Sequence, residues 1–322
     1  MKYYLIGKYP PPLGGVSVYV YRFSKLLKSQ GQRVEVIDLS KYSRHRKILI
    51  LLKLALSPER AIFYLNGLNF YVMLVLALRP FSGNIVFHDH SGRAVEDIHG
   101  IERTILKLFL RRANECILVG DHLKRYYQQK GYNLPPRTRV QNAFLPPPLE
   151  DEPKIWSTYD ETTIKFMENH SPLILANAFQ IIFYQGVDLY GIDMCLELTA
   201  QLKKKYPHIG FLFALAEIGD QKYFQELNQS IDDLDIRGNF HFVTGQKELW
   251  PLFKRADLMI RPTFVDGYGI SVTEALYFGC PAVASDVCER AQGTVLFRNR
   301  DIKDLLGKVE KVLNETSWKR VL

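Results

Sequence analysis

The stretch RPTFVDGYGISVTEALYFGCPAVASD, residues 261–286, places a glycine-containing turn between two acids at the start of a predicted helix. Seven residues separate Asp266 from Glu274, and the turn holds Gly267 and Gly269. These residues allow two explanations. In one, the turn is purely structural and Ser271 and Glu274 form a capping box at the helix start. In the other, the turn binds a ligand. Features of the rest of the chain favour one explanation over the other.

Short apolar runs alternate with amphipathic runs along the whole chain, which predicts an α/β fold with parallel sheets. We expect strands at 2–7, 33–39, 61–66, 84–89, 115–120, 138–144, 172–179, 209–215, 239–245, 257–263 and 281–286. We expect helices at 17–32, 70–78, 100–114, 121–132, 191–207, 222–234, 247–256, 269–279 and 301–315. The pattern indicates two doubly wound, Rossmann-like domains facing a central cleft.

A proline- and acid-rich run, LPPPLEDEPK at 145–154, is typical of a linker. It divides the chain into an N-terminal domain, 1–149, and a C-terminal domain, 150–322. The last helix is free to pack within its own domain or back on the first. In such folds ligands bind beyond the carboxyl ends of the strands, so the cleft is the expected site.

Charge is distributed unevenly between the halves. Residues 1–150 carry 23 Lys and Arg against 10 Asp and Glu, a net +13, whereas 151–322 carry 19 against 24, a net −5. The basic half suggests an anionic partner: a membrane surface, a phosphorylated lipid or a nucleic acid. Because no nucleic-acid-binding motif is visible, no nucleic-acid partner is expected.

Three further features bear on the compartment. The four cysteines have neither CxxC nor metal-ligand spacing and are expected to be reduced thiols in a cytoplasmic protein. The N-terminus has too short an apolar run for a signal peptide. The uncharged run at 61–78 reaches the lower limit of a membrane span, but Asn66, Gly67 and Asn69 interrupt it, which favours a buried strand followed by a helix.

The placement of the turn favours a phosphate ligand. It follows a predicted strand and precedes a helix, so it lies at the carboxyl edge of the sheet. Amides at a helix N-terminus bind phosphate, and glycines allow close approach of the backbone. Asp266 and Glu274 on either side could accept hydrogen bonds from sugar hydroxyls. A nucleotide sugar combines these groups.

The sequence around this turn also resembles that of a known protein family. The chain resembles the retaining glycosyltransferases of the GT-B fold, in the large family 4, group 1 type that includes many bacterial polysaccharide and lipopolysaccharide enzymes. Members carry two glutamates at this spacing around a Gly-aromatic-Gly turn, then "EA" and later "G.PVVAS"; here DGYGISVTEALYFGCPAVASD has Asp266 for the first glutamate. The segments GGVSVYVYRFSKLLKSQGQRVEVI and LVGDHLKRYYQQKGY also resemble the family.

The resemblance implies roles for site residues. Glu274 would hold the ribose, and Asp266 would contact the transferred sugar. His88, at a strand end, would match the active-site histidine, with His90 as the alternative. The glycines Gly14 and Gly15 would close over the phosphate from the first domain. The amides of the turn would cover sugar and diphosphate: Gly267, Tyr268, Gly269, Ile270 and Ser271.

The chain also departs from the family. Members usually carry an Arg after the first strand of the second domain and a Lys soon after, which neutralise the donor diphosphate. Here Asn177 and Tyr190 take those places, with an insertion between them. We expect Arg261 to replace the missing cations; the alternative is that it pairs with a surface acid.

The implied activity is hexosyl transfer from a nucleotide-sugar donor with retention of configuration, without a cofactor or a metal. The acceptor would be a lipid-linked saccharide or a growing cell-surface polysaccharide, as in lipopolysaccharide or capsule. The run KYSRHRKILILLKLAL, 41–56, mixes cations with apolar residues and suits an anionic membrane surface. Its alternative is a basic loop before a buried helix. We expect a peripheral enzyme on the inner face of the cytoplasmic membrane.

Other functions stay open. A non-catalytic GT-B-like subunit that binds a partner transferase or a glycan would fit the missing Arg and Lys. A nucleotide-sugar epimerase would need no acceptor. A dehydrogenase would need GxGxxG after the first strand, and KYPPPLGGVSV does not supply it.

Overall fold

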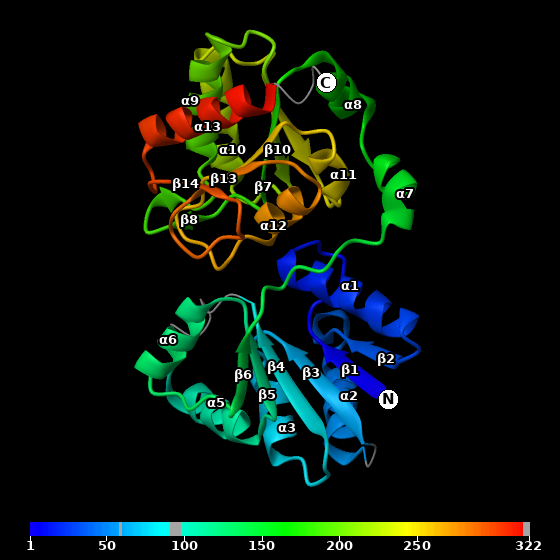
Figure 1. Cartoon of the computed structure of the whole chain (residues 1–322). Coiled ribbons are helices and arrows are strands. Elements are labelled where there is room, and N and C mark those ends of the chain that lie inside the picture. The colour runs from blue at the N-terminus through cyan, green and yellow to red at the C-terminus, as the bar shows by residue number, and fades with distance from the viewer. Residues whose placement is uncertain (58–59, 91–97, 318–322) are drawn as a thin grey trace. The chain divides into compact units, whose positions relative to one another are not determined.

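The computed structural model describes residues 1–57, 60–90 and 98–317. The chain divides into two compact units, Met1–Leu145 and Pro146–Leu322. The division falls four residues before the boundary expected from the proline-rich run. Figure 1 labels most elements of both units, each a twisted parallel sheet with helices on its two faces.

The first unit has the sheet order β2-β1-β3-β4-β5-β6, and all its pairs are parallel. Its strands are β1 Lys2–Ile6, β2 Arg33–Ile37, β3 Ala61–Asn66, β4 Asn84–Asp89, β5 Glu115–Leu118 and β6 Arg137–Val140. Its helices are α1 Gly15–Ser29, the short η1 Leu39–Lys41, α2 Arg44–Leu56, α3 Phe70–Leu78, α5 Gly100–Arg112 and α6 Asp121–Gln129.

All strands run in the same direction, but the order in which the chain adds them to the sheet reverses between β1 and β3. The crossover through α1 runs one way to β2, and the later crossovers run the other way. Because parallel crossovers are right-handed, α1 covers one face and α2, α3, α5 and α6 cover the other. The expected strand and helix in 61–78 are confirmed as β3 and α3. Within the described residues no helix combines the length and hydrophobicity that a bilayer span requires.

The second unit has the order β11-β10-β7-β12-β13-β14, again parallel. Its strands are β7 Leu173–Ala178, β10 Gly210–Leu215, β11 Phe240–Thr244, β12 Leu258–Arg261, β13 Ala282–Ser285 and β14 Val295–Phe297, with a two-stranded hairpin, β8 Phe183–Tyr184 and β9 Val187–Asp188. Its helices are η2 Leu149–Asp151, α7 Glu152–Trp156, α8 Glu161–Asn169, α9 Ile192–Lys203, α10 Gln221–Asp233, α11 Trp250–Phe253, α12 Ile270–Tyr277 and α13 Ile302–Ser317.

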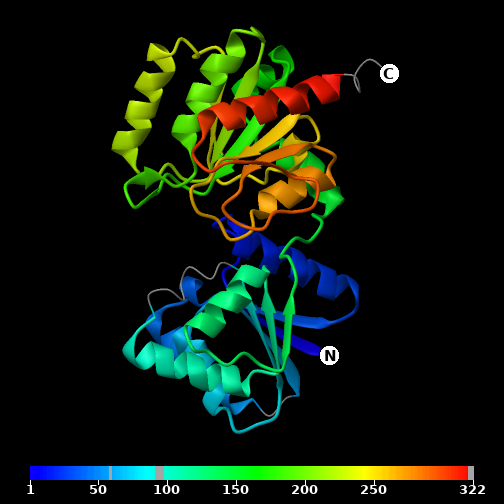
Figure 2. The same ribbon diagram turned by 60° about the vertical axis from the view of Figure 1, so that its left-hand side comes forward.

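Two buried clusters hold this unit together, one on each face of its sheet. The first gathers α9, α10 and α13 over one face, around Phe211 and Phe213 of β10. The second gathers α7, α8, α11 and α12 over the other face, around Trp250. The last helix, α13, packs against α9 within its own unit, as Figure 2 also shows. The expected alternation is confirmed, while the helices α2, α7 and α8, the strand β14 and the hairpin are not among the expected elements.

Candidate functional site

The order in which the chain adds strands to the second sheet reverses between β7 and β12, which lie side by side and run parallel. In open α/β sheets a ligand binds at such a switch point, beyond the carboxyl ends of the strands. Asn177 lies near the carboxyl end of β7, and Arg261 is the last residue of β12. The turn predicted as a binding loop follows Arg261 directly, so the fold brings it to the switch point.

Asp266 is the centre of a buried ion-pair network. Its Oδ2 accepts hydrogen bonds from Arg261 Nε at 2.9 Å, Arg290 Nη1 at 2.7 Å and Thr263 Oγ1 at 3.2 Å. Its Oδ1 accepts the amide of Gly267 at 3.0 Å. The Asp266 side chain is 7% exposed. Burial alone would raise the pKa of this carboxyl, but the two guanidinium groups outweigh burial and hold its pKa well below the usual range.

The sequence analysis does not identify Arg290 as a site residue. Its side chain is 1% exposed and spans the turn: besides Asp266 it donates to Thr263 Oγ1 at 3.1 Å and to the hydroxyl and carbonyl oxygens of Ser285, each at 3.1 Å. It therefore ties the 263–269 turn to the end of β13. Its signal in the sequence is only a cation in the loop after a buried strand.

Arg261 pairs with Asp266, not with a surface acid. It also donates to the carbonyl oxygen of Asn177 at 3.0 Å, and its guanidinium lies 5.2 Å from the ring centre of Tyr190. The guanidinium of Arg261, which we expect to neutralise the donor diphosphate, is thus already paired with the carboxylate of Asp266. The expected role of Asp266 on a sugar hydroxyl would fall to Oδ1, because Oδ2 already accepts three donors.

The expected capping box at Ser271 is wrong. The N-cap of α12 is Gly269, in the left-handed region at φ 77°, and Ser271 is already the second helical residue. A Cβ on Gly269 would lie 2.6 Å from Arg290 Nη1, so glycine is required by both the backbone and the space. Among the described residues no side chain caps α12, so the amides of Ile270 and Ser271 stay available at its start.

The other helix N-terminus near the switch point is filled. Asp188, 3% exposed, accepts the amides of Tyr190 and Gly191 on Oδ1 and of Ile192 on Oδ2, at 2.8–3.2 Å. Its carboxylate takes the place that an anionic ligand would take at the start of α9. The helix start that remains for a diphosphate is that of α12.

Two further predicted residues lie on elements that meet at this region, α12 and β7. Glu274, in the second turn of α12, is buried at 7% exposure. The Oδ1 atom of Asn177 is buried and has no hydrogen-bond partner among the described residues. An unsatisfied buried acceptor at a switch point is consistent with a ligand that donates to it.

In the first unit, α1 begins at Gly15 with Gly14 extended as its N-cap. Ser17 fixes this start, because its hydroxyl accepts the Gly14 amide at 2.9 Å and donates to the carbonyl of Pro12 at 2.6 Å. The expected closure of this loop over a phosphate stays a prediction.

His88 and His90 lie at the carboxyl end of β4 with their rings stacked, centres 4.0 Å apart. Tyr64 bridges them to α1: its hydroxyl contacts His88 Nδ1 at 3.1 Å and the Tyr19 hydroxyl at 3.0 Å. His90 Nε2 contacts Asn66 Oδ1 at 3.1 Å. His88 Nε2 and His90 Nδ1 are buried and have no hydrogen-bond partner in the described part of the chain.

Both imidazoles are neutral near pH 7. Burial, with smaller effects of His90 and Arg139, holds the pKa of His88 well below its ordinary value. Burial lowers the pKa of His90 to about 3. Neutral rings with one unused nitrogen each can donate to or accept from a ligand hydroxyl. Both candidate histidines therefore lie at the end of β4, and the role that the resemblance gives to one of them stays a prediction.

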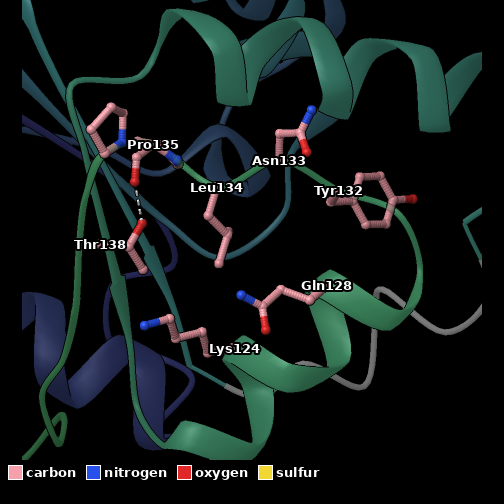
Figure 3. Close-up of a pocket in the computed structure, with 8 residues that line it drawn as sticks. Lys124, Gln128, Tyr132, Asn133, Leu134, Pro135 and Thr138 are labelled. Carbon is pink, nitrogen blue, oxygen red and sulfur yellow. Dashed lines mark hydrogen bonds between the residues drawn. The ribbon is translucent and has the colours of Figure 1, made fainter.

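A shallow pocket of about 300 Å³ also lies in the first unit, between α6 and the loop before β6. Lys124 and Gln128 point into it, and Thr138 donates to the carbonyl of Pro135 at its rim (Figure 3). This loop enters β6 at the amino edge of the sheet, opposite the edge that carries His88. None of the predicted site residues lines it, so the pocket is not the predicted site.

Across the described residues, no group of three or more His, Cys, Asp or Glu side chains could hold a metal ion. The expectation that neither a metal nor a cofactor is needed stays a prediction. The four cysteines are free thiols, three of them buried.

Residues 170–320 match the family model described as glycosyl transferases group 1. This matched segment is similar to a group 1 glycosyltransferase domain, and it holds the switch point, the 263–269 turn and α12. Over 128 residues the chain is 29% identical to the lipopolysaccharide glucosyltransferase WaaG of Escherichia coli (strain K12), a segment that covers 37% of this chain and a third, 33%, of that relative.

Solved structures agree with this fold, and their similarity extends over both units. Anabaena Alr3699/HepE, in complex with UDP and glucose, matches with a TM-score of 0.69 at 18% identity, over 98% of this chain and 91% of that one. WaaG, a glycosyltransferase involved in lipopolysaccharide biosynthesis, matches with a TM-score of 0.60 at 18% identity, over 98% and 90%. The fold is GT-B, as the sequence predicted.

Proposed function

We propose that this protein transfers a hexosyl group from a nucleotide-sugar donor to a saccharide acceptor, with retention of configuration. The observation that carries the proposal is the uncapped N-terminus of α12 behind the Gly267–Gly269 turn, at the switch point of a group 1 glycosyltransferase domain. Solved relatives of this fold carry UDP and glucose or UDP-glucose, which makes a UDP-sugar the first donor to test.

In this proposal the diphosphate meets the amides of Ile270 and Ser271, and Glu274 accepts from the ribose hydroxyls. As the sugar–phosphate bond breaks, negative charge grows on the diphosphate, and the fixed dipole of α12 stabilises it. Asp266 stays ionised, because two arginines hold its pKa low, so it orients the turn and supplies no proton. The neutral His88 is suited to bind a hydroxyl of the transferred sugar.

The acceptor in this proposal is a lipid-linked saccharide or a growing cell-surface polysaccharide. The partial match to a lipopolysaccharide enzyme supports it, as does the excess of positive charge in residues 1–150. An acceptor carried on lipid would place the enzyme at the inner face of the cytoplasmic membrane.

The test is a thermal-shift screen of nucleotide sugars on the wild type and Glu274→Ala. A ligand at a hundredfold excess over its dissociation constant stabilises the fold by about 2.7 kcal/mol. The matched control is Glu226→Ala on α10, whose side chain is 56% exposed and pairs with Lys222 on the surface. The proposal requires one nucleotide class to raise the melting temperature of wild type and control but not of Glu274→Ala. Transfer and product anomer are then read by NMR.

A non-catalytic subunit that binds a partner transferase or a glycan is the second candidate. The observation that favours it is that Arg261 and Arg290 are both paired with Asp266, while Asn177 and Tyr190 supply no further cation. Donor binding with neither transfer nor hydrolysis across all acceptors would support this candidate.

A further inference from the structure

Helix α3, FYVMLVLAL, contains no polar side chain other than a tyrosine, yet it is not fully buried. Tyr71 is 75% exposed, Leu74 37% and Leu78 65%. These residues follow one another at spacings of three and four, so they form one stripe on the outer side of the helix. A helix that is apolar all round is normally covered on all sides. The stripe therefore needs a partner.

The neighbouring helices continue this apolar surface. On α2, Ile48, Leu49, Leu52 and Leu56 are 49–65% exposed and share one face. On α5, Ile101 is 76% exposed and Leu108 39%. Helix α3 packs against both α2 and α5, on the same face of the sheet (Figures 1 and 2). The exposed sides of all three helices thus point away from the sheet together.

A buried arginine makes this layer rigid. Arg79, just after α3, donates to the carbonyl oxygens of Leu54 and Ser57 at the end of α2. It also donates to those of Phe81 and Ser82 at 2.7 and 2.9 Å. The ends of α2 and α3 are therefore joined, and the apolar surface is a feature of the folded unit.

The two helices that flank α3 are rich in cations. Helix α2 carries Arg44, Arg46 and Lys47 with no acid, besides Lys53, which pairs with Glu35 of β2. Helix α5 carries Arg103, Lys107, Arg111 and Arg112 against the single acid Glu102. A second copy of this face would bring like charges together, so the charge disfavours self-association here. The complementary partner is apolar and anionic.

We propose that the outer face of α2, α3 and α5, called here the docking face, binds an anionic lipid bilayer. Its leucines, isoleucines and Tyr71 enter the boundary of the acyl chains, and its cations lie at the headgroups. The proposed function explains why such docking would be useful, since a lipid-linked acceptor lies in that bilayer. The docking itself requires neither donor nor acceptor.

The test is co-sedimentation with vesicles of one part phosphatidylglycerol to two parts phosphatidylcholine, against vesicles of phosphatidylcholine alone. The full-length protein should bind the anionic vesicles and bind the neutral ones much more weakly. The apolar variant Leu49→Ser/Leu52→Ser/Leu78→Ser should lose at least tenfold in affinity. The charge variant Arg44→Gln/Arg46→Gln/Lys107→Gln should lose on the order of fivefold per cation.

The matched control is Leu234→Ser/Leu296→Ser, which removes two leucines that are 40% and 45% exposed in the second unit. It should bind like wild type, and all variants should keep the wild-type melting temperature because the changed side chains are exposed. Absence of anionic-vesicle binding by wild type, or equal binding by the apolar variant, overturns the proposal in favour of a protein partner. Nucleotide-induced thermal shifts on the same proteins report the proposed function separately.

Discussion

Arg290 donates to Asp266 at 2.7 Å across 24 residues of sequence, and the Cβ that Gly269 lacks would lie 2.6 Å from the same Arg290 nitrogen. The arginine thus occupies the space left by the glycine. The shape of the turn therefore depends both on the Arg290–Asp266 ion pair and on the absence of a side chain at Gly269.

Gly269→Ala should cost more stability than Gly279→Ala. Both glycines have φ near +77°, where an L-residue costs roughly 1–2 kcal/mol. A Cβ at position 279 meets nothing within 4 Å, whereas at 269 it displaces Arg290. Chemical denaturation measures both, and nucleotide affinity should fall only for Gly269→Ala. Equal losses of stability in the two variants would show that the close contact with Arg290 does not add to the cost of Gly269→Ala.

Asp266→Asn should destabilise the second unit by about 3–5 kcal/mol, because it leaves two buried guanidinium groups without their carboxylate. The folded pKa is depressed, so the contribution is complete above the unfolded value of about 3.9 and is lost as the pH falls below it. The difference from wild type should be constant from about pH 5 to 8 and shrink below about pH 4. The exposed pair is the control: Asp235→Asn, which loses Lys203, should change little.

His88 should make stability depend on pH. Its folded pKa lies below the unfolded value of about 6.5, so the unfolded chain binds more protons and stability falls as the pH drops from that value. His88→Gln should remove up to about 1.4 kcal/mol per pH unit from the slope between about pH 6.5 and 5. Tyr64→Phe, which removes the hydroxyl bonded to His88, should lower stability without removing the slope. An unchanged slope in His88→Gln would mean that folding does not lower the pKa of this ring.

Asp188→Ala tests which helix start receives the diphosphate. Losing this cap of α9 should cost about 1 kcal/mol or more. Nucleotide affinity should stay within about twofold of wild type, because the assigned site is the start of α12. A marked gain in affinity would instead mean that α9 accepts the diphosphate once its own carboxylate is gone.

Much of the fold could be predicted because its signals are local. The run 61–78 has polar residues at its centre, and β3, α3 and β4 have the expected bounds. Short elements were missed: β14 has three residues, and the hairpin strands two each. The start of helix α8 has an N-cap residue that can be recognised in the sequence, because Asp160 accepts the amide of Thr163 at 2.7 Å.

The candidate site was harder to predict because its contacts are not local. The turn and Glu274 come to the predicted edge of the sheet. However, the partner of Asp266 depends on β12 and β13 being neighbours, which places Arg290 beside it. No local pattern reports that pairing. Likewise the carboxylate that fills the start of α9 comes from the unexpected hairpin, through Asp188.

The Asp188 carboxylate at the N-terminus of α9 also affects how donor affinity should depend on ionic strength. Near the switch point, Asp188 compensates one helix dipole, and Asp266 is shared by Arg261 and Arg290, so the one net positive charge that remains there is buried and not exposed to solvent. The start of α12 offers oriented amides in place of mobile cations. Salt screens exposed charges far more than buried dipoles at contact distance. Donor affinity should therefore stay nearly constant as salt is raised, although the protein as a whole is strongly basic.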